Sequence, residues 1–163
     1  TRDSASGRVR SRRGIVHAAV DWTGRGGGFL VAFEIPTTHA DLLKRETKAF
    51  ANLALVTSDA RPQVTPMWFD YDGECIIFNT ARGRVKDRVM KKLPAVALSV
   101  VDPSNPYRYL QIRGTVIGVT EDGAYDSICD LRMKYLGNRD YPKNPGEQRV
   151  IYRVRPDRCN TMG

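Results

Sequence analysis

The apolar segments of this sequence are all of strand length, and this limits what the chain can fold into. The longest runs, residues 53–56 and 96–101, are far shorter than the roughly 20 apolar residues that a membrane-spanning helix needs. Short apolar segments alternate with turn signals, of which the strongest is Asp72-Gly73, a pair typical of β-hairpins. No Gly-x-Gly-x-x-Gly follows a predicted strand, so a dinucleotide-binding domain is not expected.

Strands joined by hairpins, with three inserted helices, account for most of the chain. The strands are expected at residues 53–57, 63–71, 75–80, 95–101, 107–119 and 149–154. The helices are expected near residues 37–50, 83–93 and 121–136. Pro66 cannot donate to a ladder, which predicts an edge or an opening there, and Gly114 predicts a bend or a close backbone approach. The pattern predicts a mostly β fold, a small antiparallel barrel with peripheral helices.

The first residues differ in composition from the rest. Residues 1–28 hold six arginines against Asp3 and Asp21, which is +4 of the chain's net charge of +8. Such a segment, rich in Arg, Gly and Ser, buries too little apolar surface to offset its ordering entropy. We therefore assign residues 1–33 to a basic Gly/Arg-rich N-terminal extension and residues 34–163 to one folded domain. The rest is only mildly basic, so the charge does not favour nucleic-acid binding.

Cysteine and histidine are too few and too scattered for most kinds of catalytic or metal site. Cys75, Cys129 and Cys159 lie far apart, unlike a disulfide framework or the close pairs of a zinc site. With His17 and His39 as the only histidines, no Ser/His/Asp set or metal cluster can be assembled. No apolar leader segment is visible, so we expect a cytoplasmic protein without a membrane anchor or a metal.

One stretch, residues 61–88, carries the pattern that points to a ligand. An interrupted strand edge would leave the backbone of Gln63 to Thr65 free to meet a planar heterocycle. Next come Asn79 and Thr80 at a strand end, and then a helix start with several basic residues. A helix N-terminus with hydroxyl and guanidinium groups nearby is a good phosphate site. From charge alone, a solvent-exposed basic helix face is the simpler interpretation. The hydroxyl at the adjacent strand end favours the other interpretation, a ligand-binding site.

Several short motifs follow one another in a fixed order along the chain. They lie at residues 61–69, 78–80, 84–88, 102–103, 106–110 and 113–114. In this order and spacing they resemble the pyridoxamine 5'-phosphate oxidase-like FMN-binding split-barrel superfamily, and within it the subgroup of oxidoreductases that use the deazaflavin coenzyme F420. The resemblance extends over about residues 36–158. It implies a homodimeric split β-barrel that binds its cofactor between the two protomers.

The resemblance also implies which residues contact the cofactor. Those beside the tricyclic ring would be Gln63, Val64, Thr65 and Pro66. Those that hold the phosphate would be Asn79, Thr80, Arg84 and Lys86, with Arg88 next to them. Those that close the site from the second subunit would be Tyr107, Arg108 and Tyr109. The role of Arg88 stays open, because Val89 stands where relatives often carry a polar residue.

The resemblance implies an oxidoreductase in which the reduced deazaflavin passes a hydride to a small unsaturated organic substrate, without a catalytic histidine or carboxylate. Two alternatives stay open. FMN could replace coenzyme F420, since both carry phosphate anions that Arg84 and Lys86 would bind. The barrel could also carry a flavin, a deazaflavin or a tetrapyrrole without turnover. Tyr107 and Tyr109 share one strand face and could be packing or dimer contacts instead.

Overall fold

Short strands make up most of the folded chain, which a computed structural model describes for residues 34–163. In chain order the elements are the 3-10 helix η1 (Ala40–Leu43), β1 (Phe50–Val56), β2 (Pro62–Met67), β3 (Phe69–Tyr71), β4 (Ile76–Ala81), α1 (Val85–Lys92), β5 (Ala95–Val101), β6 (Tyr109–Thr120), α2 (Ala124–Leu136) and β7 (Arg149–Met162). The predicted N-terminal extension, residues 1–33, lies outside the described residues. Within residues 34–163, no helix has the length and apolar character to cross a membrane.

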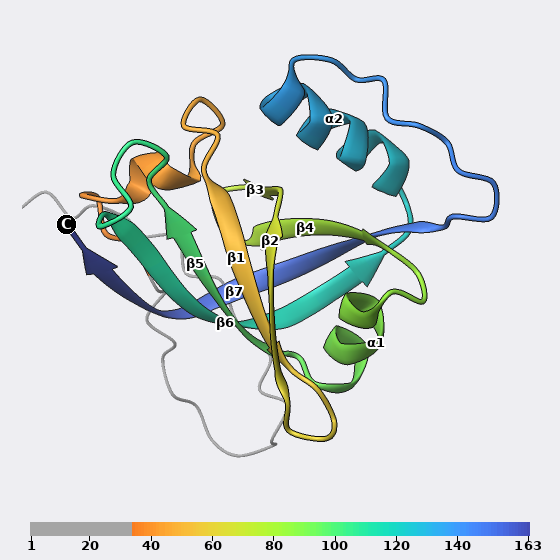
Figure 1. Ribbon diagram of the computed structural model, residues 1–163, viewed down its shortest axis with the longest axis horizontal. Helices are drawn as coiled ribbons and strands as arrows, with labels where there is room; N and C mark the ends of the chain where they lie inside the picture. Colours follow the sequence, from red (N-terminus) through yellow and green to blue (C-terminus); the bar gives the residue numbers. More distant parts are fainter. Residues whose placement is uncertain (1–33) are drawn as a thin grey trace, which may run out of the picture. The chain divides into compact units, whose positions relative to one another are not determined.

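The strands form one seven-stranded antiparallel sheet in the order β2-β1-β5-β6-β7-β4-β3. Figure 1 shows that the sheet is strongly curled, with the long strands β6 and β7 crossing it and the helices at its periphery. Helix α1 contacts β1 and β4, and α2 contacts β7 and β4. This arrangement confirms the predicted fold class, a mostly β split barrel with peripheral helices.

The core lies on one face of the sheet and follows from the two-residue period of the strands. Leu53, Leu98 and Ile112 are cross-strand neighbours on β1, β5 and β6, and each is at most 2% exposed. Further along the sheet, Phe78 of β4 pairs with Tyr152 of β7, and both are fully buried. Burial of an apolar side chain of this size stabilises a fold by about 1.5–3 kcal/mol. This core therefore decides which residues of β2 and β4 face the interior.

The helix predicted at residues 37–50 is wrong in length, because only the short 3-10 helix η1 forms there. Its Leu42 and Leu43 bury against the core. The carbonyl oxygen of Asp41, which a longer helix would need, accepts a hydrogen bond from the Thr47 hydroxyl at 2.6 Å. The chain then turns through Lys48, whose φ is 50°, and enters β1. Tertiary packing of two leucines thus overrides the local helix signal.

The two strands that differ most from their predicted boundaries each contain a proline. Pro66 lies within β2, opposite Asn52, and the interruption falls instead at Trp68, between β2 and β3. The predicted edge is confirmed, since β2 is an outermost strand of the sheet, where proline is tolerated. The strand predicted at residues 149–154 continues as β7 because Pro156 falls opposite Gly114 at a register shift, which accommodates it.

Gly114 lies where β6 passes very close to β7, which confirms its predicted close backbone approach. A Cβ on this residue would lie 2.5 Å from the carbonyl oxygen of Arg155 and 2.8 Å from Cγ1 of Val154. Because the nearer contact is with backbone, we expect Gly114→Ala to lower the free energy of unfolding in urea by about 1–3 kcal/mol. Gly118→Ala is the matched control, since its Cβ would come no nearer than 3.5 Å, to the flexible side chain of Arg153. Equal losses in the two variants would contradict this explanation.

Candidate functional site

The edge strand β2 presents its side chains in two alternating rows. Gln63 and Thr65 pair with fully or almost fully buried leucines of β1 and so lie on the interior face of the sheet. Val64 is 62% exposed on the opposite face, where Pro66 is also exposed. Of the four residues predicted beside a cofactor ring, two therefore lie on the interior face and two on the solvent face.

Three buried side-chain polar atoms of residues 34–163 have no hydrogen-bond partner, and all belong to predicted cofactor residues: Gln63 Oε1, Thr65 Oγ1 and Thr80 Oγ1. Thr80 lies on the interior face of β4, opposite the fully buried Val150. An unpaired buried polar group costs about 1–3 kcal/mol, so such atoms are rare without a ligand or an ordered water. One amide oxygen and two hydroxyls fit the polar edge of a planar heterocycle and the sugar-alcohol chain that joins it to a phosphate.

Asn79 precedes Thr80 in β4 but has a different environment. Its amide nitrogen donates to the carbonyl oxygen of Ala124 at 2.7 Å, and its Oδ1 accepts from Nε of Arg149 at 2.8 Å. The residue is 5% exposed. Both ends of the amide thus have partners within the chain, and Asn79 joins the end of β4 to the start of α2.

The turn between β4 and α1 gathers the predicted phosphate-binding cations. Arg84 caps the start of α1, and its Nη2 lies 2.7 Å from Oε2 of Glu147. Lys86 is half-buried and has no ion-pair partner within residues 34–163; burial, and then the charge of Arg84, lower the pKa of Lys86. Arg88 folds back, and its guanidinium donates to the carbonyl oxygen of Gly83. An anion at this turn would therefore compensate a cation to which the described chain offers no counter-charge.

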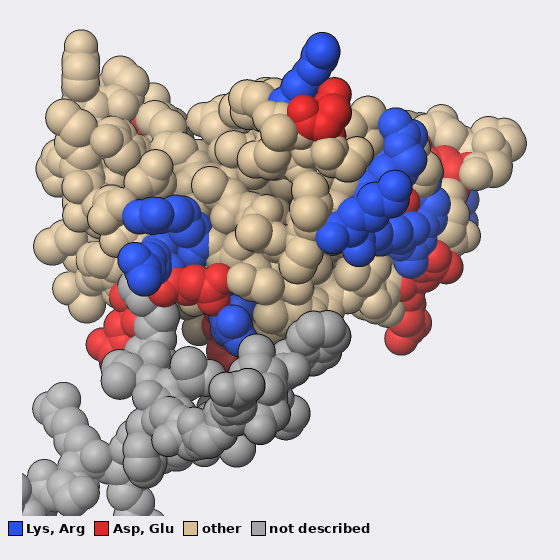
Figure 2. Space-filling view, turned by 90° about the horizontal axis from the view of Figure 1, so that it is seen from below, with Lys and Arg blue, Asp and Glu red and all other residues tan. Residues whose placement is uncertain are grey.

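Basic side chains continue from this turn along the surface of α1. Arg84, Arg88, Lys91 and Lys92 are all exposed. Figure 2, which looks at the molecule from below the view of Figure 1, shows a concentration of Lys and Arg in its right half, the side on which α1 lies. A surface of one charge sign raises the local concentration of ligands of the opposite sign. This surface therefore favours an anionic ligand.

Asp87, in the first turn of α1, holds the turn together from inside. The residue is 1% exposed, and its carboxylate accepts hydrogen bonds from Gly83 N–H at 2.9 Å, the Tyr152 hydroxyl at 2.7 Å, and Arg82 and Lys91 at 3.0 Å each. Burial alone would raise the pKa of Asp87, but these hydrogen bonds outweigh it and lower the pKa below its ordinary value. Sequence reasoning missed this residue, although an acid in the first turn of a basic helix was its signal.

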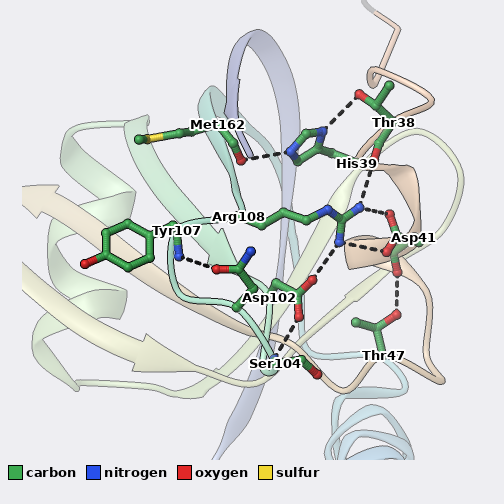
Figure 3. Close-up of polar contacts among 10 residues, drawn as sticks. Thr38, His39, Asp41, Thr47, Asp102, Ser104, Tyr107, Arg108 and Met162 are labelled. Carbon is green, nitrogen blue, oxygen red and sulfur yellow. Dashed lines mark hydrogen bonds and ion pairs between the residues drawn. The ribbon is translucent and has the colours of Figure 1, made fainter.

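Arg108 has partners on three sides, as Figure 3 shows. Its guanidinium donates to Asp41 Oδ1 at 2.6 Å, to Asp102 Oδ2 at 2.8 Å and to the carbonyl oxygen of Thr38 at 2.8 Å. The hydrogen bonds that Arg108 donates to Asp41 and Asp102 raise the pKa of Arg108. Tyr107, next to it, is 74% exposed. Arg108 thus ties the loop between β5 and β6 to η1 and to Thr38 just before it, and the loop presents Tyr107 to the solvent.

The predicted closing residues lie far from the basic turn within one chain. Strand β5 begins just after α1 and ends at the loop that carries Tyr107 and Arg108, with Tyr109 at the start of β6 (Figure 1). At about 3.3 Å per residue, β5 spans about 20 Å. Thr80 and the cations of α1, which follow one another along the chain, therefore form one set of candidate contacts, and residues 107–109 form a separate one.

A cavity of about 370 Å³ lies elsewhere, between α2 and the sheet. Ile77, Leu131 and Ile151 contribute its apolar lining, and none of the predicted cofactor residues is among its walls. Each aspartate of its lining has an ion-pair partner within the chain: Asp72 Oδ2 lies 2.8 Å from Nη1 of Arg153, Asp70 pairs with Arg45 and Asp130 pairs with Arg139. The buried polar atoms and Lys86, all without a partner in the part of the chain that the structure describes, make β2, β4 and the start of α1 the better candidate for an anionic cofactor.

A curled antiparallel sheet with peripheral helices and a basic turn after its fourth strand is typical of the class of split-barrel oxidoreductase folds, which bind flavin-type cofactors. The chain belongs to the pyridoxamine 5'-phosphate oxidase family, whose model matches residues 36–163. This membership confirms the predicted superfamily. No curated protein sequence matches the chain.

Solved structures agree with this assignment. An F420 reductase is 39% identical, with a TM-score of 0.67 over 77% of this chain and 98% of that one. A conserved hypothetical protein from Mycobacterium tuberculosis is 18% identical, with a TM-score of 0.61 over 81% of this chain and 87% of that one. PhzG from Burkholderia lata, in complex with tetrahydrophenazine-1-carboxylic acid, is 20% identical, with a TM-score of 0.52 over 75% and 72%. The last two show the shared fold alone.

Proposed function

We propose that this protein is an F420H2-dependent reductase that transfers a hydride to a small unsaturated organic substrate. The observation that carries this proposal is the likeness to an F420 reductase, 39% identical over 98% of that chain. The three unpaired buried oxygens, and Lys86 with no ion-pair partner among the described residues, support it, because they match the needs of a polar heterocycle that ends in a phosphate group.

The chain's own residues would bind and orient the cofactor. Gln63 Oε1 and Thr65 Oγ1 would meet the polar edge of the ring from β2. The Thr80 hydroxyl, Arg84 and Lys86 would hold the phosphate. When bound, the reduced deazaflavin supplies the hydride, so the protein needs no nucleophile or metal of its own for that chemistry. Orientation of one ring face toward the substrate is then the main task of the barrel.

A homodimer would complete the site. Because β5, which is about 20 Å long, separates residues 107–109 from the end of α1, we propose that they serve the cofactor of the partner protomer. The exposed Tyr107 would make the contact, and Arg108 would hold its loop through Asp41 and Asp102. The resulting assembly would hold two equivalent sites.

FMN is the second candidate cofactor. The turn before α1 offers two cations, Arg84 and Lys86, which match the two charges that a phosphate monoester approaches at neutral pH. On this alternative the same residues bind the ring and the phosphate, and the protein is a flavin-dependent oxidoreductase of the same fold.

Parallel fluorescence titrations with coenzyme F420 and with FMN, each at two salt concentrations, test the proposal. We expect micromolar or tighter binding of coenzyme F420, weakened at the higher salt concentration because ionic contacts with the phosphate are screened. Tighter binding of FMN than of coenzyme F420 would support the alternative, a flavin-dependent oxidoreductase. Binding of neither cofactor would contradict the proposed function and the site with it.

A further inference from the structure

One carboxylate lies directly beside the proposed phosphate-binding cations. The loop between α2 and β7 brings Glu147 to the start of α1, where its Oε2 lies 2.7 Å from Nη2 of Arg84. The Glu147 side chain is 14% exposed, whereas that of Arg84 is 52% exposed. A phosphate that approaches Arg84 from the solvent would therefore meet a fixed negative charge behind it.

Glu147 is held in this position from its other side. Its Oε1 lies 3.1 Å from Nη1 of Arg149, which is 7% exposed. Arg149 is itself fixed, since its Nε donates to Asn79 Oδ1 at 2.8 Å and its guanidinium lies over the ring of Tyr141, 5.2 Å from the centroid. Arg149 is thus held between Asn79 of β4 and two residues of the loop between α2 and β7, which limits its movement. Glu147 can therefore move away from Arg84 only if its ion pair with Arg149 also breaks. Its negative charge stays close to Arg84 when a ligand binds there.

We propose that Glu147 is a specificity-determining residue that favours cofactors whose phosphate carries one negative charge over those whose phosphate carries two. This inference rests on the proposed function, which puts the phosphate at Arg84 and Lys86. A phosphodiester such as that of coenzyme F420 is a monoanion, whereas the monoester of FMN carries about −1.5 to −2 at pH 7. Coulomb repulsion from one fixed carboxylate grows in proportion to the charge of the phosphate beside it, so it penalises the monoester about 1.5 to 2 times as strongly.

The test compares dissociation constants of the full chain and its Glu147→Gln variant for FMN, coenzyme F420 and riboflavin, which lacks the phosphate. We expect the variant to bind FMN about tenfold more tightly and coenzyme F420 only about threefold more tightly, since removal of the carboxylate relieves the dianion most. Riboflavin binding should not change. Glu147→Ser gives a second neutral variant if the glutamine variant does not fold.

Glu121→Gln is the matched control, because it removes the same charge from an ion pair with Arg82, two residues before Arg84. It should leave the ratio of FMN to F420 affinities unchanged. An equal gain for both cofactors, no gain for either, or the same shift in the Glu121 variant would overturn the inference while the proposed function stands. If neither the wild-type protein nor the variants bind either cofactor, the proposed function and the inference both fail.

Discussion

Replacement of Asp87 by alanine is expected to lower the free energy of unfolding by about 3 kcal/mol or more, the cost typical of breaking a buried, hydrogen-bonded charge network. The variant leaves the Gly83 N–H without its acceptor and Arg82 and Lys91 without a shared counter-charge. The Tyr152 hydroxyl loses the carboxylate at 2.7 Å and keeps only the backbone carbonyl oxygen of residue 87 at 3.2 Å. Urea unfolding at pH 7 measures the loss. The turn before α1 should also become less ordered, because Arg82 and Gly83 of this turn both donate hydrogen bonds to the Asp87 carboxylate.

The same variant has a characteristic pH dependence. Since the partners of Asp87 lower its pKa in the folded state, the unfolded chain takes up the proton first as the pH falls. The stabilisation by Asp87 is therefore complete above its unfolded pKa of about 4 and declines progressively at lower pH. We expect the difference in unfolding free energy between wild type and Asp87→Ala to be constant from pH 6 to 8 and to shrink below about pH 4.

Asp126→Ala provides the matched control for this prediction. Asp126 also lies in the first turn of a helix, α2, but it is exposed. Its removal should cost at most about 1 kcal/mol, which is the usual size of a charge–dipole interaction at a helix start. A similar loss in both variants would mean that Asp87 acts through the helix dipole alone and that its buried hydrogen bonds contribute little.

The local patterns of this sequence predict most of its fold. The β3–β4 hairpin could be predicted because Asp72-Gly73 favours a tight turn by its backbone preferences alone. Helix α1 could be predicted from the four-residue apolar spacing of Val85 and Val89, and its stop from Pro94. These signals act within a few residues, so no knowledge of the tertiary structure is needed to interpret them.

The errors occur where contacts distant in sequence decide the conformation. The extent of β7 depends on a register shift opposite Gly114, more than 40 residues earlier. The loss of the helix after Thr38 depends on the burial of Leu42 and Leu43 against a core built mainly from later strands. Neither the end of β7 nor the end of η1 is marked by a local sequence signal strong enough to show it. Residue pattern and propensity therefore favour the wrong boundary at both.

The candidate site shows the same division. Thr80, Arg84 and Lys86 lie within one hairpin-to-helix segment, and their types and spacing alone indicate an anion site. Glu147 approaches Arg84 from 63 residues further along the chain, and its surroundings in sequence resemble an ordinary polar loop. Arg108 is predicted as a cofactor contact, but the structure gives it three partners within its own chain. A sequence pattern can thus nominate charged residues without showing which of them are already paired.

Removal of both phosphate-binding cations is expected to have the largest effect on cofactor binding. Arg84→Ala combined with Lys86→Ala should weaken the binding of coenzyme F420 by about 3 kcal/mol, a rise in Kd of roughly 100-fold, as expected when two charge-assisted hydrogen bonds to a phosphate are lost. Fluorescence titration measures the change. Riboflavin, which has no phosphate, should bind wild type and variant equally if its ring contacts come from β2 and β4. Thermal unfolding without ligand should change little, because Arg84 is half exposed and Lys86 has no ion-pair partner within residues 34–163.

The control must remove the same charge without touching the turn. Arg139→Ala with Arg155→Ala does so, since both side chains are about half exposed and each pairs with a nearby aspartate outside β4 and α1. If binding depends on a directed contact with phosphate, this pair of substitutions should raise Kd by no more than about twofold at physiological salt, where exposed charges beyond about 8 Å are screened. A comparable loss of affinity in both double variants would show that the overall positive charge attracts the cofactor. Unchanged binding in the Arg84/Lys86 variant would show that the phosphate does not bind at the start of α1.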